Sequence, residues 1–135
     1  MRRNGFRKLS ADIAVPEANF HRMMRFYRDS LEGSGLDRVL FGHIGECHVH
    51  ANLLPRSDRE LAEAKELMLA FVKEGVRLGG TVSAEHGIGK IKHEYLREMY
   101  GAGGVAEMAL VKKAFDPNCV LNLDNVFPKE LLSEA

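Results

Sequence analysis

Two helix-type hydrophobic stripes, separated by segments with β-strand character, restrict the folds open to this chain. After Pro16, apolar side chains recur at the three- and four-residue spacing of a helix with one buried face. A second stripe of the same kind follows Ser57. Short β-prone segments precede, separate and follow the two helices. The stripes consist of Phe20, Met23, Met24, Tyr27 and Leu31, and of Leu61, Ala64, Met68, Phe71 and Val72.

Residues that start or stop helices mark the ends of these elements. Pro16 suits the start of a helix, and Gly33 stands where a C-terminal cap is expected. Ser57 and Glu60 form a capping-box pattern, and the pair Gly79-Gly80 ends the second helix. The predicted strands are residues 8–15, 38–44, 47–54 and 81–83.

The resulting order of strand, helix, strand, strand, helix, strand predicts an α+β fold of the ferredoxin-like βαββαβ type. Residues 1–90 would form an antiparallel sheet with both helices on one face, and the other face would be left for a partner or a site. Residues 91–135 predict a C-terminal extension of two helices, 91–100 and 105–115, separated by Gly101–Gly104. For residues 121–135 we expect an extended tail.

Composition excludes several classes of partner. Lys+Arg and Asp+Glu both number 19, and this zero net charge argues against non-specific binding of nucleic acid. No apolar run approaches the roughly 20 residues of a membrane span, and no apolar segment follows the basic start, so we expect no secretory signal. Two cysteines, Cys47 and Cys119, provide no disulfide framework and favour a reducing cytoplasm.

Four of the six histidines lie in two short segments, residues 42–52 and 81–89. His43 and His50 are seven positions apart, so a single straight strand would send them to opposite faces. A two-residue type II′ hairpin at Gly45-Glu46 would instead place His43 opposite His48. In that register His43, His48, His50 and Asn52 project from one face of the sheet.

Two imidazoles and one carboxylate on a surface match the 2-His-1-carboxylate pattern of metal sites with open coordination positions. Glu85 is the natural third ligand beside His43 and His50, and His86 could accept a proton next to the metal. A single histidine on a strand is more often a half-exposed surface residue. For His48, a supporting or merely structural role is therefore as reasonable as ligation.

Three blocks together resemble the C-terminal domain of FAD-linked oxidases in the vanillyl-alcohol oxidase superfamily, which includes D-lactate dehydrogenase, the glycolate oxidase flavin subunit and D-2-hydroxyglutarate dehydrogenase. The family pattern is approximately G-H-x-G-[DE]-G-N-x-H-x-N, then G-T-x-S-x-E-H-G-I-G, then D-P-x-x-x-L-N-P-G-K. This chain supplies Gly42–Asn52, Gly80–Gly89 and Asp116–Asn122 in that order. Cys47-His48 replaces the family's Gly-Asn, and Leu123–Asn125 replaces Pro-Gly-Lys.

The resemblance implies a divalent ion, most often zinc, held by His43, His50 and Glu85. It also implies that Asn52, with His48 beside it, contacts a 2-hydroxy acid, and that His86 takes the hydroxyl proton while hydride leaves for the flavin. Asn122, in the last block, is the candidate contact with the FAD cofactor.

These observations predict the substrate- and metal-binding C-terminal portion of an FAD-dependent 2-hydroxy-acid dehydrogenase. FAD would be held by a partner domain or subunit, on which residues 91–135 would pack, and the chain alone would not be catalytically competent. One alternative is a stand-alone ferredoxin-like module that binds a metal or another ligand. Another is a split-gene remnant with a structural role, whose sheet self-associates into a homo-oligomer.

Overall fold

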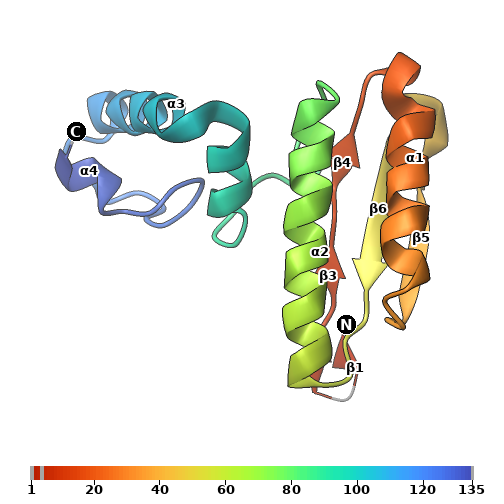
Figure 1. Ribbon diagram of the computed structural model, residues 1–135. Coiled ribbons are helices and arrows are strands. Elements are labelled where there is room, and N and C mark those ends of the chain that lie inside the picture. The colour runs from red at the N-terminus through yellow and green to blue at the C-terminus, as the bar shows by residue number, and fades with distance from the viewer. Residues whose placement is uncertain (1, 4, 135) are drawn as a thin grey trace. The chain divides into compact units, whose positions relative to one another are not determined.

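The computed structural model describes residues 2–3 and 5–134 and divides into two compact units, Met1–His86 and Gly87–Ala135 (Figure 1). The first unit contains the sheet and two long helices, and the second is helical. None of the helices in the described part of the chain is both long enough and apolar enough to cross a membrane.

Strand β6 (His48–Leu53) is the centre of the sheet. On one side it pairs antiparallel with β5 (Arg38–His43), and on the other with the short strands β3 (Leu9–Ser10) and β4 (Ile13–Ala14). β3 and β4 together correspond to the predicted strand 8–15. The strands β1 (Arg2–Arg3) and β2 (Phe6–Arg7) form a separate antiparallel pair ahead of the main sheet.

The fourth strand is reduced to a single antiparallel bridge between Thr81 and Ala14, so the prediction of a strand over 81–83 is wrong. From Ser83 onward the chain leaves the ladder: Ser83 Oγ and the His86 backbone N–H donate to the Asp12 carboxylate, and the Ala84 N–H donates to the Asp12 backbone carbonyl. The lateral order is Thr81, β3 with β4, β6, β5. That order confirms the ferredoxin-like α+β arrangement.

Helices α1 (Glu17–Glu32) and α2 (Asp58–Arg77) cover the same face of the sheet (Figure 1). Their buried stripes meet in the core, where the rings of Tyr27 and Phe71 pack edge to face with centroids 4.8 Å apart. The side chain of Ser57 caps α2 by accepting a hydrogen bond from the Glu60 backbone N–H at 3.2 Å. From the sheet, Ile13, Val49, Ala51 and Leu53 complete this core.

The hairpin between β5 and β6 differs from its predicted form but keeps the predicted register. The loop is a 3-10 turn, η1 (Ile44–Glu46), closed by Cys47 in a left-handed conformation with φ of 53°. The two-residue type II′ turn is therefore wrong, yet His43 still pairs with His48. Compared with the predicted hairpin, the loop is longer by one residue on each side, Ile44 on the β5 side and Cys47 on the β6 side. Because both strands are shortened equally, the same side chains still share a face.

The second unit is built on α3 (His93–Phe115), which is interrupted at Gly101 by a non-helical backbone with φ of 69° and ψ of 174°. The predicted division into two helices is thus present, but the break is one residue rather than four. The predicted extended tail is wrong: the chain turns back, forms α4 (Leu131–Glu134), and buries Phe127 and Leu132. Ala135 lies outside the described residues. The buried core of this unit consists of Leu96, Val105, Ala109, Phe127 and Leu132.

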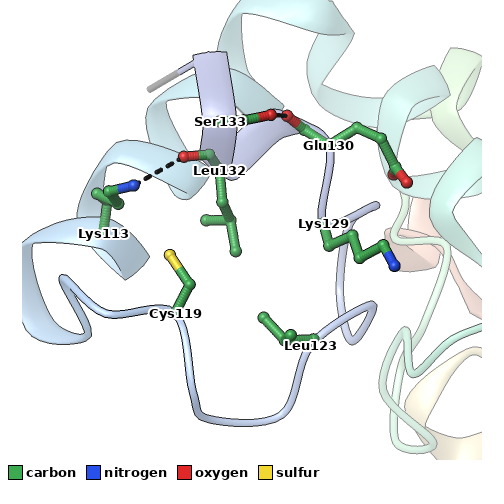
Figure 2. A pocket seen from close by; sticks show the side chains of 7 residues that line it. All are labelled: Lys113, Cys119, Leu123, Lys129, Glu130, Leu132 and Ser133. Carbon is green, nitrogen blue, oxygen red and sulfur yellow. Dashed lines mark hydrogen bonds between the residues drawn. The ribbon is translucent and has the colours of Figure 1, made fainter.

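A cavity of about 380 Å³ lies within the second unit (Figure 2). The Lys113 ammonium at its edge donates a hydrogen bond to the Leu132 carbonyl at 3.0 Å. Its lining is a mixture of aliphatic and charged side chains without a histidine, so it does not offer the ligand set predicted from the sequence. The lining residues are Lys113, Cys119, Leu123, Lys129, Glu130, Leu132 and Ser133.

Candidate metal centre

The register of β5 and β6 gathers three imidazoles on the sheet face that α1 and α2 do not cover. His43 lies opposite His48, and His50 follows two positions later on the same face of β6. The ring centroids of His48 and His50 are 4.4 Å apart, and those of His43 and His48 are 5.4 Å apart. His48 and His50 are buried, whereas the His43 side chain is 55% exposed. His43 therefore stands at the solvent side of the cluster.

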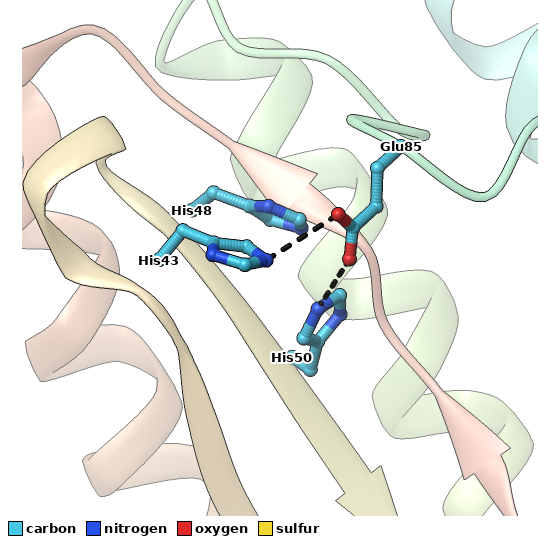
Figure 3. Close-up of side chains that lie close together, drawn as sticks. All are labelled: His43, His48, His50 and Glu85. Carbon is cyan, nitrogen blue, oxygen red and sulfur yellow. Dashed lines mark ion pairs between the residues drawn. The ribbon is translucent and has the colours of Figure 1, made fainter.

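Glu85 extends its carboxylate into the space between these rings (Figure 3). Its Oε1 is 2.8 Å from His50 Nε2, and its Oε2 is 3.3 Å from His43 Nε2. His86 joins the cluster from the other side: its ring stacks on that of His50 with centroids 4.9 Å apart, and its Nε2 is 3.4 Å from Glu85 Oε1. The two histidine segments of the sequence thus meet at one point in space.

Asp12 is the residue that the sequence analysis missed. It lies in the gap between β3 and β4, is 1% exposed, and projects to the same face as the imidazoles. Its Oδ1 accepts from His48 Nε2 at 2.9 Å, and its Oδ2 accepts from Ser83 Oγ and the His86 backbone N–H, both at 2.9 Å. One sequence signal could have found it, because an acidic residue stands between the apolar residues Ala11 and Ile13 in a predicted strand, where a carboxylate requires a partner if it is buried.

The charge of Asp12 also acts on the core beneath the sheet. Burial raises the pKa of Tyr27 well above its ordinary value, and the electrostatic effect of Asp12 raises it further. Because this pKa lies far above neutral, the phenol stays protonated at pH 7. Its hydroxyl has no hydrogen-bond partner within the described part of the chain.

The donor set suits a transition-metal ion of the zinc type. Two overlapping groups of residues, which share His50 and Glu85, each have ligand atoms that lie within 4.8 Å of one another. Imidazole nitrogens and carboxylate oxygens are the ligands such ions take in sites that keep a position open. Within the described residues, the buried His50 Nδ1 has no hydrogen-bond partner, which leaves this ring able to carry its proton there and ligate through Nε2. The groups are His43, His48, His50 and Glu85, and Asp12, His50, Glu85 and His86.

The remaining predicted site residues have different surroundings. Asn52, two positions beyond His50 on β6, is buried, and its Oδ1 accepts a hydrogen bond from the Lys8 ammonium at 3.2 Å. This lysine, also missed from the sequence, places a positive charge on the same face of the sheet as the imidazoles. Asn122 belongs to the second unit, where it is exposed in a left-handed conformation with φ of 46°.

The fold is thus an open-faced antiparallel α+β sheet that carries a cluster of histidines and carboxylates with the donor types of a metal site. Comparison with known families then identifies the chain more closely. Residues 1–126 match the family described as FAD linked oxidases, C-terminal domain, and the chain belongs to that family. The resemblance predicted from the three sequence blocks is therefore confirmed.

Individual relatives are 2-hydroxy-acid oxidoreductases. The chain is 32% identical over 118 residues to a mitochondrial cytochrome-type D-lactate dehydrogenase of Saccharomyces cerevisiae, with 87% of this chain and 20% of the relative covered. It is 28% identical over 121 residues to the glycolate oxidase subunit GlcD of Bacillus subtilis, with 88% and 26% covered. A probable D-2-hydroxyglutarate dehydrogenase of Oryza sativa subsp. japonica is 31% identical over 124 residues, with 90% and 21% covered. The chain thus spans about a fifth to a quarter of the length of these curated relatives.

Proposed function

We propose that this chain is the substrate- and metal-binding C-terminal portion of an FAD-dependent dehydrogenase of 2-hydroxy acids such as D-lactate or glycolate. The observation that carries the proposal is the convergence of His43, His50 and Glu85, whose ligand atoms lie within 4.8 Å of one another on the uncovered face of the sheet. The names of the relatives support the class of substrate.

In this proposal His43 and His50 offer their Nε2 atoms, and Glu85 offers its carboxylate, to a divalent cation, with zinc favoured by the mixed imidazole and carboxylate set. Bound there, the cation would supply Lewis-acid chemistry by lowering the pKa of the substrate hydroxyl and neutralising its carboxylate. FAD, held by a partner domain or subunit, would supply the redox chemistry.

The chain's own residues then bind, orient and deprotonate the substrate. His86 accepts the hydroxyl proton at Nε2, the ring atom that lies 3.4 Å from Glu85 and thus faces the cluster. Asn52 offers a side-chain amide to the substrate, and the neighbouring Lys8 ammonium adds a positive charge that favours a carboxylate. Because Asp12 occupies His48 Nε2, a contact between His48 and the substrate would use the other ring nitrogen.

We also propose that residues of the second unit pack against the FAD-binding part of the enzyme, with Asn122 near the cofactor. What supports this is a set of large apolar side chains that the unit exposes, of which Phe115 is 86% exposed. Exposed apolar side chains in such number commonly mark an interface where they gather on one surface. The exposed side chains are Ile91, Tyr100, Leu110, Val111, Phe115, Val120 and Leu121.

Metal content tests the site directly. After loading with Zn²⁺ and dialysis, we expect the wild-type chain to retain about one equivalent by elemental analysis and His50→Ala to retain little. Loss of a direct imidazole ligand should weaken affinity by more than about 100-fold, because losing an outer partner alone costs roughly 10- to 100-fold. His21→Ala is the matched control, since His21 is an exposed histidine of α1, and it should retain metal like the wild type.

Equal metal in the wild type and His50→Ala would contradict the proposed site. A second readout addresses the substrate: adding D-lactate to the Co²⁺-loaded chain should shift the visible absorption of the ion, because the hydroxy acid enters an open coordination position. An unchanged spectrum at saturating D-lactate would contradict the assignment of hydroxy-acid binding to this face.

A further inference from the structure

Asp12 divides its two carboxylate oxygens between two parts of the candidate metal centre. Oδ1 faces the imidazoles of β6, at 2.9 Å from His48 Nε2 and 3.9 Å from His50 Nδ1. Oδ2 faces the segment that follows Thr81, where it accepts hydrogen bonds from Ser83 Oγ and the His86 backbone N–H. A single buried carboxylate therefore connects the strand that presents His50 with the segment that presents Glu85.

Among the residues that the structure describes, His50 Nδ1 has no hydrogen-bond partner. His50 Nδ1 is buried, and at 3.9 Å from Asp12 Oδ1 it lies just outside hydrogen-bond distance. A histidine that binds a cation through Nε2 carries its proton on Nδ1, and ligating histidines regularly donate that proton to a carboxylate. Asp12 Oδ1 lies where a small movement of the ring would complete this bond.

We propose that Asp12 is a positioning residue of the metal centre. When the ion binds, Asp12 accepts a hydrogen bond from the His50 proton on Nδ1, so that Nε2 exchanges its 2.8 Å contact with Glu85 for the ion. Asp12 also fixes the 83–86 segment so that Glu85 meets the same ion. In this proposal Asp12, although it belongs to the second donor group, orients the ligands rather than binding the ion, because it is buried and its oxygens accept hydrogen bonds from His48, Ser83 and the His86 backbone. This inference rests on the proposed metal-binding function.

The geometry separates this role from simple support of a loop. If Asp12 only held the 83–86 segment, the hydrogen bonds to Oδ2 would be sufficient. Oδ1, however, lies against the imidazoles of His48 and His50. Burying a carboxylate costs free energy unless donors surround it. The two rings beside Asp12 Oδ1 are those of His48 and His50, and His50 is a proposed ligand, so the charge of Asp12 acts directly on the basicity and orientation of that ligand.

The test compares Zn²⁺ and Co²⁺ dissociation constants of the full chain for the wild type, Asp12→Asn and Ser83→Ala. Asp12→Asn keeps the side-chain shape but removes the charge, and we expect metal affinity to fall by about 10- to 100-fold. The visible spectrum of bound Co²⁺ should change with it. Ser83→Ala removes one donor to Oδ2 but leaves the bonds from the His86 and Ala84 backbone N–H groups that hold the segment, and it leaves the charge beside the imidazoles, so affinity should stay within about 3-fold of the wild type.

Wild-type affinity in a folded Asp12→Asn chain would overturn the inference while leaving the proposed metal site intact. Failure of the wild type to bind either ion would overturn both. A measurement on the wild type alone covers the case in which Asp12→Asn does not fold. In ¹⁵N NMR spectra of the Zn²⁺-loaded protein, His50 should carry its proton on Nδ1 and the metal on Nε2; metal on Nδ1 would overturn the inference.

Discussion

Single carboxylates organise both units of this protein at the scale of the residue. Asp12 connects two segments in the first unit, and Asp116 has a comparable structural role in the second. Asp116 follows the last residue of α3, is buried, and accepts hydrogen bonds from the backbone N–H groups of Val120 and Leu121 at 3.1 and 2.9 Å. The Lys112 ammonium also donates to it. These donors hold the pKa of Asp116 at about 2, and the bond from Lys112 is the largest cause.

Because the pKa of Asp116 is lowered, the free energy of unfolding of the second unit should depend on pH in the acidic range. An Asp whose pKa is lower in the folded chain than its ordinary value of 3.8 stabilises the fold above that value, and the contribution is lost as the pH falls toward about 2. Asp116→Asn should therefore lower the thermal midpoint by a few degrees at pH 7, and most of the difference from the wild type should be lost by pH 2. Thermal unfolding at pH 7, 4 and 2 measures this.

Glu107→Gln is the control for this experiment, because Glu107 is an exposed carboxylate on the same helix. It should leave the midpoint nearly unchanged at all three values of pH. A constant difference between Asp116→Asn and the wild type from pH 7 to pH 2 would show that the ionised form of Asp116 does not carry the stabilisation.

At the scale of the element, the β5–β6 hairpin determines where the metal ligands lie. Gly42 precedes His43 on β5 and pairs with Val49, and its lack of a side chain lets the two strands approach. A Cβ at this position would lie 2.5 Å from the His48 carbonyl oxygen and 2.9 Å from Val49 Cα. Both are backbone atoms of the central strand, so they cannot move aside without disturbing the sheet.

Gly42→Ala should therefore destabilise the chain by about 1–3 kcal/mol, the usual cost of forcing extra volume into a packed site. It should also weaken Zn²⁺ binding, because separating β5 from β6 moves His43 away from Glu85. Urea denaturation and metal titration measure the two effects. Gly45→Ala, in the adjacent turn, is the matched control: a Cβ at that position meets nothing within 4 Å, so neither quantity should change appreciably. Equal behaviour of the two variants would contradict the packing argument.

At the scale of the whole molecule, every member of the candidate metal centre belongs to the unit Met1–His86, whereas Gly87–Ala135 has a core of its own. Stability of the second unit and metal affinity are therefore expected to respond to different substitutions. Phe71 and Phe127 allow a matched comparison, since each is a buried phenylalanine in the core of one unit.

Phe127→Ala should cost about 3–5 kcal/mol in the stability of the second unit, from lost burial and the cavity it leaves. Zn²⁺ affinity should remain within about 3-fold of the wild type, because no ligand lies in that unit. Phe71→Ala should cost a similar free energy but weaken metal binding as well, since Phe71 supports the sheet from its helix-covered face. Urea unfolding and metal titration of both variants test this, and parallel losses of affinity would contradict it.

Several parts of the fold could be predicted because they depend on local patterns. Helices α1 and α2 follow from their apolar stripes and terminal residues, since burial of one face fixes a period that can be counted along the chain. The pairing of His43 with His48 was also accessible, because an even-numbered loop preserves which side chains share a face. The type of turn could not be predicted, because Cys47 adopts a left-handed conformation that cysteine does not favour.

The sequence by itself determined the α+β order of elements, the family, and the identity of the imidazoles and the carboxylate that converge. Only the tertiary structure decided that Asp12 joins them, that residues 81–83 keep a single bridge, and that the chain after Asp116 folds back onto its own unit. The physical reason is the same in each case. Periodicity reports which face of an element is buried, whereas a buried carboxylate or a folded tail depends on partners that are distant in the sequence.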